Sequence, residues 1–200
     1  MKIVKGRRTR VLLASSVVIG GACAGAIAAQ SRDPGMPANL QAALLNDPLV
    51  KVADIPAASG HPSRGVFVQE TSVGYVCVWD APNATSQARR GGCNRDDAPL
   101  GGKALSANLT YDGGPSISAI TDAVLFGLTA ADVEGLEILM SDGTTRTVQL
   151  RGASVGGKAF RAFGYRLKQS DLRDGVGPVA AVALDGKGAE IDRQPTGFGS

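Results

Sequence analysis

The sequence predicts a mainly β protein: an antiparallel β-sandwich or open barrel, preceded by an N-terminal signal or transmembrane helix and a Pro/Gly-rich tether. Three observations lead to this prediction. An uncharged apolar run follows a basic N-terminus. Short apolar runs with period-two alternation, which is typical of half-buried strands, fill the chain after residue 65. Finally, 27 glycines and 10 prolines mark many turns between short elements.

Residues 1–29 have the pattern of a signal peptide or membrane anchor. Nineteen uncharged residues, 11–29, follow a basic stretch that contains Lys2, Lys5, Arg7, Arg8 and Arg10. This order keeps the N-terminus in the cytoplasm and directs the following chain outward. The run fits a cleavage site near Ala28 and is also long enough to span a bilayer, so secretion and anchoring both remain open. Lipidation at Cys23 is a third alternative, because small residues precede this cysteine.

The distribution of charge argues against a nucleic-acid partner. The chain has 21 basic and 18 acidic side chains, a formal net charge of +3. Without the five basic residues of the N-terminus, 16 basic and 18 acidic side chains remain, a net charge of −2. A phosphate-binding face needs clustered Lys and Arg. After the N-terminus, only Arg89, Arg90 and Arg95 lie close together in the sequence.

Residues 30–62 are interpreted as a tether, because prolines and glycines interrupt any long regular element there. A short helix is expected at 38–45, and His61, the one histidine of the chain, is expected to be a solvated tether residue. A β-rich extracytoplasmic domain is expected at 63–196, followed by a tail at 197–200.

Alternating apolar residues and turn dipeptides locate the expected strands. Asp142-Gly143 and Asp185-Gly186 each separate two alternating runs, as in a tight hairpin. Strands are expected at residues 66–70, 73–79, 103–109, 123–128, 136–140, 147–150, 159–167, 178–184 and 189–193.

Cys77 and Cys93 are expected to form a disulfide. They are the two cysteines of the predicted domain, and outside the cytoplasm such a pair is normally oxidised. The alternative is a metal site, but two cysteines and one histidine cannot complete a tetrahedral zinc shell from soft ligands. No metal site and no cofactor are therefore expected.

Short motifs that suggest catalysis lack the required context. Residues 152–156 (GASVG) match a nucleophile elbow, but no histidine follows them, and the pattern is interpreted as a loop. Residues 152–158 approach a phosphate-binding loop, but Ala159 stands where Ser or Thr would hold Mg²⁺. No catalytic residue can be nominated.

Residues from about Gly74 to Arg193 resemble exported β-domain proteins of high-GC Gram-positive bacteria, a family without a known activity. The features that carry the resemblance are the strand Tyr75-Val76-Cys77-Val78, Cys93 after a polar loop, Phe126-Gly127-Leu128, and the hairpins at Asp142-Gly143 and Asp185-Gly186. The resemblance implies an exported location, a disulfide and a β-domain.

These observations favour a non-catalytic extracytoplasmic binding or interaction module with an envelope or extracellular partner. The expected contact surface is a loop at residues 81–97 that presents Arg89, Arg90 and Arg95. One alternative is a cell-envelope-acting enzyme with acidic catalytic residues brought together from separate strands. Another is a purely structural segment of the envelope.

Overall fold

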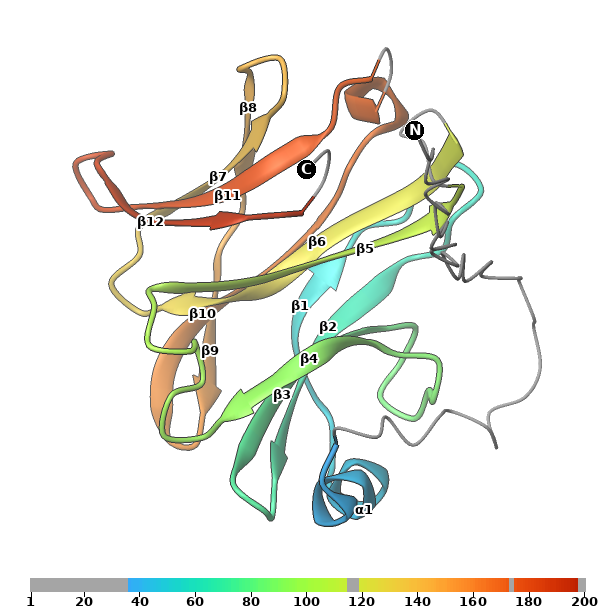
Figure 1. The fold of residues 1–200 in the computed structure, drawn as a ribbon, viewed down its shortest axis with the longest axis vertical. Helices are drawn as coiled ribbons and strands as arrows, with labels where there is room; N and C mark the ends of the chain where they lie inside the picture. Colours follow the sequence, from blue (N-terminus) through green and yellow to red (C-terminus); the bar gives the residue numbers. More distant parts are fainter. Residues whose placement is uncertain (1–35, 115–118, 173–174, 198–200) are drawn as a thin grey trace, which may run out of the picture. The chain divides into compact units, whose positions relative to one another are not determined.

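Three antiparallel four-stranded sheets make up most of the structure (Figure 1). The structure is a computed structural model that describes residues 36–114, 119–172 and 175–197. The predicted signal or anchor at 1–29 and most of the tail lie outside the described residues. Within the described ranges, no helix has both the length and the apolar character needed to cross a membrane.

The first sheet follows the order of the chain and contains β1 (Val50–Ile55), β2 (Arg64–Thr71), β3 (Tyr75–Ala81) and β4 (Arg90–Arg95). The second sheet contains, in spatial order, β5 (Leu105–Gly113), β6 (Ile120–Ala130), β10 (Lys158–Arg166) and β9 (Arg151–Val155). The third sheet contains β12 (Glu190–Pro195), β11 (Pro178–Leu184), β7 (Gly135–Met140) and β8 (Thr145–Val148). The helix α1 (Ala38–Asn46) precedes β1, and a short 3-10 helix, η3 (Gln169–Leu172), follows β10.

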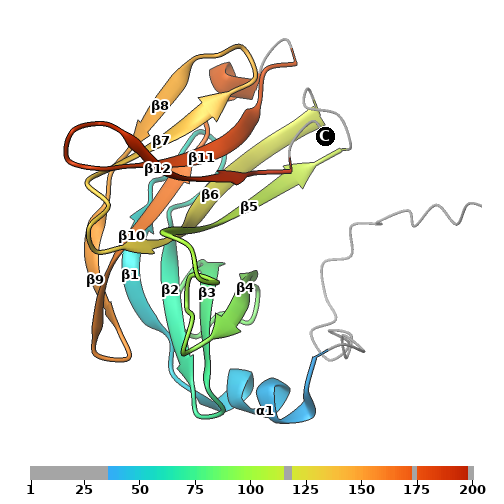
Figure 2. The same cartoon turned by 60° about the vertical axis from the view of Figure 1, so that its left-hand side comes forward.

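The second sheet is the middle layer of the stack (Figure 2). On one face it contacts the first sheet, where β4 lies over β5 and β3 over β6. On the other face it contacts the third sheet, where β12 lies over β5. The arrangement is a β-sandwich with an additional layer, which confirms the predicted mainly β, antiparallel fold and leaves the sheets unclosed.

Strand β6 shows how the sequence produces a middle sheet that is buried on both faces. Its run Ala123–Leu128 is continuously apolar, because a strand covered on both faces needs apolar side chains at every position. Val124, Phe126 and Leu128 pack against the first sheet, whereas Ala123 and Leu125 pack against the third. Gly127 is required in this run, because a Cβ atom there would lie 2.0 Å from the carbonyl oxygen of Ser106 on β5.

A smaller cluster covers the outer face of the first sheet. Phe67, Cys77 and Trp79 form its buried centre, and Leu44 and Leu49, from α1 and the segment after it, pack against them. The helix therefore lies on the side of the first sheet that faces away from the other two sheets (Figures 1 and 2).

Most of the predicted elements are confirmed within a few residues. The expected strands correspond to β2, β3, β5, β6, β7, β8, β10, β11 and β12, and the expected helix corresponds to α1. Both predicted hairpins exist, because β7 pairs with β8 and β11 pairs with β12, each antiparallel.

Three strands were not predicted. Residues 50–55, which sequence analysis placed in the tether, form β1 and pair with β2; the flanking prolines mark the ends of this strand. Residues 151–155, interpreted as a loop, form β9 and pair with β10 through a turn at Gly156-Gly157. Residues 90–95, also expected in a loop, form β4. Both β4 and β9 contain glycine, which lowers the strand signal of the sequence.

Candidate functional site at the edge of β4

The disulfide between Cys77 and Cys93 is confirmed, and it joins two directly opposite residues of β3 and β4. Their Cα atoms are 3.9 Å apart. Opposite residues that do not exchange backbone hydrogen bonds lie closer together than hydrogen-bonded pairs. We therefore assign this pair to the type without backbone hydrogen bonds, so the N–H and C=O groups of Cys93 point away from β3. By the alternation of an antiparallel ladder, those of Gly91 point the same way.

Strand β4 is an open edge of the first sheet. Among the described residues it pairs with β3 alone, and its register is free of bulges from Arg90 to Arg95. Arg90, Gly91 and Gly92 are exposed. No hydrogen bond between described residues involves the outward backbone groups of Gly91 or Cys93. This edge can therefore accept another strand, and the disulfide holds it in place.

The neighbouring edge of β5 is covered. Gln194 of β12 accepts a hydrogen bond from the N–H of Ala107 (2.7 Å) and donates one to its C=O (2.8 Å), so its amide substitutes for a pairing strand. Asp192 accepts from the N–H groups of Ala104 and Leu105. Side chains block this edge in the way that natural sheets commonly avoid unwanted pairing.

Two of the three arginines of the predicted site lie in a strand rather than a loop, and the three do not share a face. This corrects the sequence-based interpretation: Arg90 and Arg95 are the first and last residues of β4, and Arg89 precedes it. Arg90 reaches toward β5, where it forms an ion pair with Asp112 and donates to the C=O of Tyr111. Arg90 therefore helps to cover the edge of β5.

Arg89 and Arg95 lie on the outer face, each over an aromatic ring of β3. The guanidinium carbon of Arg89 is 5.0 Å from the ring centre of Trp79, and that of Arg95 is 5.5 Å from the ring centre of Tyr75. Arg89 also donates to the C=O of Leu44 near the end of α1, and burial lowers the pKa of its guanidinium. Neither arginine forms an ion pair with a described carboxylate.

Sequence analysis missed the aromatic partners of these arginines. Tyr75, Cys77 and Trp79 are spaced by two residues, so a strand places all three on one face. That spacing was the signal in the sequence from which two aromatic rings beside the disulfide could have been predicted. The buried Gln69 was also missed: it accepts from the indole N–H of Trp79 and donates to the C=O groups of Leu44 and Asp47, which fixes α1 on the sheet.

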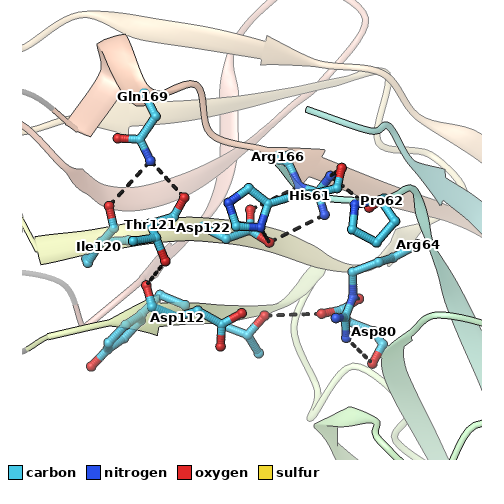
Figure 3. Close-up of polar contacts among 12 residues, drawn as sticks. His61, Pro62, Arg64, Asp80, Asp112, Ile120, Thr121, Asp122, Arg166 and Gln169 are labelled. Carbon is cyan, nitrogen blue, oxygen red and sulfur yellow. Dashed lines mark hydrogen bonds and ion pairs between the residues drawn. The ribbon is translucent and has the colours of Figure 1, made fainter. Parts of the chain in front are cut away.

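Two buried carboxylates lie between the first and second sheets (Figure 3). Asp80 of β3 forms an ion pair with Arg64 of β2, and only 2% of its side chain is exposed. It also accepts a hydrogen bond from the Thr110 hydroxyl at 3.4 Å. Burial raises the pKa of Asp80, and this effect exceeds the lowering by the arginine.

The second carboxylate is Asp122 of β6, whose partner is Arg166 of β10. The Nε atom of Arg166 lies 3.0 Å from Oδ1 of Asp122, and 3% and 9% of the two side chains are exposed. Arg166 also donates through Nη1 to the C=O groups of Pro56, His61 and Pro62; His61 and Pro62 are labelled beside it in Figure 3. The expectation that His61 is a solvated tether residue is wrong, since its Nδ1 atom lies 3.7 Å from Asp122.

Two hollows flank the ends of β4. A cleft of about 340 Å³ near its C-terminal end is lined by residues that include Glu70, Asp96, Asp97 and Lys158. A groove of about 190 Å³ lies beside Arg89, between α1 and residues 84–87. Neither lining includes Asp80 or Asp122. Within the described part of the chain, no three His, Cys, Asp or Glu side chains are placed to hold a metal ion.

Comparisons with protein-family models, with curated proteins and with solved structures gave no match. The resemblance to exported β-domain proteins thus stays an expectation from the sequence. The support for a function comes from the arrangement of the chain's own residues.

Proposed function

We propose that this chain is a non-catalytic extracytoplasmic interaction module that holds a protein partner at the edge of β4. The observation that carries the proposal is the combination of an open strand edge with a disulfide that fixes it. An exposed edge offers a row of backbone donors and acceptors, and extended peptides bind to such edges as an added strand. A covalently fixed edge loses less conformational freedom on binding, which favours affinity.

An extracytoplasmic location is supported by the disulfide and by the N-terminal sequence. Disulfides form and persist in oxidising compartments and are rare in the cytosol. The basic and apolar pattern of residues 1–29 is typical of export or anchoring.

The enzyme alternative has weaker support. Asp80 and Asp122 are both buried carboxylates on separate strands, the kind of residue that the enzyme alternative requires. Each, however, forms an ion pair with an arginine: Asp80 with the partly exposed Arg64, and Asp122 with the buried Arg166. A general acid or base must reach a proton of its substrate, and a carboxylate held in a buried ion pair does not offer that access. We assign these two pairs a structural role.

Site-specific photo-crosslinking in the producing cell tests the proposal. A photoreactive phenylalanine replaces Ala88, an exposed residue beside the start of β4. The matched control replaces Gly152 on β9, another edge strand, where an added Cβ atom meets no atom within 4 Å. We expect a discrete cross-linked partner from position 88 and none from position 152. Equal products from both positions, or none from position 88, would contradict the proposal.

A further inference from the structure

We infer that the partner of β4 is an extended acidic peptide segment that adds to the sheet as a fifth strand, with carboxylates facing Arg89 and Arg95. This inference rests on the proposed function and specifies the partner's chemistry. It has two supports: the backbone groups on the edge, and the positions of the uncompensated positive charges.

The backbone groups define the geometry of the added strand. Gly91 and Cys93 direct their N–H and C=O groups outward, two residues apart, which is the spacing at which a β-ladder forms on one edge. The neighbouring edge of β5 is covered by Gln194 and Asp192. Of these two edges, only that of β4 can therefore pair with an added strand. The added segment must be extended, because only an extended chain matches this spacing.

The charges define the side chains of the added strand. Arg89, directly before β4, and Arg95, at its end, are six residues apart and lie over aromatic rings on the outer face of β3; neither has a carboxylate partner among the described residues. Six residues of a strand span about 20 Å, at roughly 3.3 Å per residue. An added strand therefore reaches both guanidinium groups with acidic residues at positions i and i+6. The positions between them pass Gly91 and Cys93, which carry no charge.

A second copy of the chain fits less well. When two β4 strands pair antiparallel with Gly92 at the centre, Arg89 of each copy faces Arg95 of the other. Like charges directly opposite each other on adjacent strands are destabilising. Self-association is therefore an outcome that the experiment must detect, not the expected one.

Peptide binding to the full-length, oxidised chain in mild detergent tests the inference. The probe is the capped heptapeptide Glu-Thr-Val-Thr-Val-Thr-Glu, and the first control has Lys in place of both Glu residues. A second control carries proline at the third position, which faces Gly91 or Cys93 in an antiparallel pairing, so the proline removes one backbone donor to the edge. We expect the acidic peptide to bind about tenfold more tightly than the Lys peptide, from two exposed charge pairs that change sign. We also expect the proline peptide not to bind, and the affinity of the acidic peptide to fall as salt concentration rises.

A charge exchange locates the site. Arg95→Glu is expected to weaken binding of the acidic peptide and to strengthen binding of a peptide with Lys at the terminal position that faces residue 95. Arg151→Glu on β9 is the matched control, because Arg151 is also an exposed arginine of an edge strand. This control should leave all affinities unchanged. The rescue distinguishes a direct charge contact from a general loss of structure, which would weaken both peptides.

The outcomes separate the inference from the proposed function. Equal affinity for the acidic and Lys peptides, or no rescue with Arg95→Glu, overturns the inference. If cross-linking from position 88 still captures a partner, the proposed function survives that result. If the captured partner is a second copy of the chain, the inference is overturned in favour of self-association. If the acidic and Lys peptides bind equally and position 88 also captures no partner, the inference and the proposed function are both overturned.

Discussion

Replacing Arg166 with methionine should destabilise the domain strongly. Arg166→Met keeps an apolar stem of similar length but removes the guanidinium group that lies against Asp122. The C=O groups of Pro56 and Pro62 lose their donor at the same time, whereas that of His61 keeps the N–H of Ala58. The segment before β2 and the middle sheet would therefore be uncoupled at this point.

The buried carboxylate sets the size of the effect. Only 9% of the Asp122 side chain is exposed, so after the substitution its charge stays in a poorly solvated position without its arginine partner. Removal of one member of a buried ion pair costs about 3–5 kcal/mol. The two carbonyl groups add less, because Pro56 and Pro62 are exposed and water can replace the lost donor. Domains of this size unfold with about 5–15 kcal/mol, so the expected loss of about 4 kcal/mol is a large fraction of the total.

Urea unfolding followed by tryptophan fluorescence measures this loss. Trp79 is the one tryptophan of the chain and is 8% exposed, so its emission reports the first sheet. The double variant Arg166→Met, Asp122→Asn provides the control, because it removes both charges; it should be more stable than Arg166→Met alone. A loss below about 1 kcal/mol for the single variant, or a double variant that is less stable than the single one, would refute the reasoning.

Three further predictions concern other parts of the fold. Replacing Cys77 and Cys93 with alanine should reduce the free energy of unfolding by about 3 kcal/mol in the loop-entropy model, since the bridge closes a separation of 16 residues; urea unfolding of the oxidised wild type and the variant measures this. Gln194→Ala should cost about 1–2 kcal/mol and promote self-association, because the edge of β5 at Ala107 becomes unpaired; sedimentation at several concentrations would reveal the association, and a strictly monomeric variant would contradict it. Because burial raises the pKa of Asp80 above 3.8, the folded state binds more protons than the unfolded state between these two values. The stability of the wild type relative to Asp80→Asn should therefore be highest below about pH 3.8 and fall as pH rises through the folded pKa; a constant difference between pH 3 and 7 would count against this assignment.

Sequence patterns predicted the hairpins well because alternation and Asp-Gly turns are local signals. The β7–β8 and β11–β12 pairs followed directly from them. The apolar run of β6 predicted a strand but was not interpreted as burial on both faces, which is the property that places it in a middle layer. The stacking of three sheets depends on contacts between residues far apart in the chain, and a single sequence carries no direct signal for those.

The candidate site was predicted in part. The cysteine pairing followed from chemistry and compartment, and the arginines of the segment around it led to the expectation of a contact surface there. The strand character of residues 90–95 was missed, because its glycines are tolerated only where a neighbour fills the space: the Trp79 ring lies within 3.1 Å of the position of a Cβ atom on Gly91. Arg90 points toward β5 and Arg89 lies over Trp79 on the outer face, because adjacent residues of an extended chain point to opposite sides. An interpretation of this segment as a loop could not predict that difference.

The order of the sheets along the chain has a consequence for biosynthesis. The first sheet uses four consecutive strands and is complete at Arg95, with its disulfide partners already present. Its inner apolar face, which includes Val66, Val68, Val76 and Val78, is fully covered only when β10 has joined β6 in the middle sheet, and β10 ends at Arg166. At roughly 5–20 residues per second, synthesis of the intervening chain takes on the order of 4–14 s. During that interval the first sheet is a folding intermediate with an exposed apolar face. This is the stage at which a chaperone would find the largest apolar surface to bind.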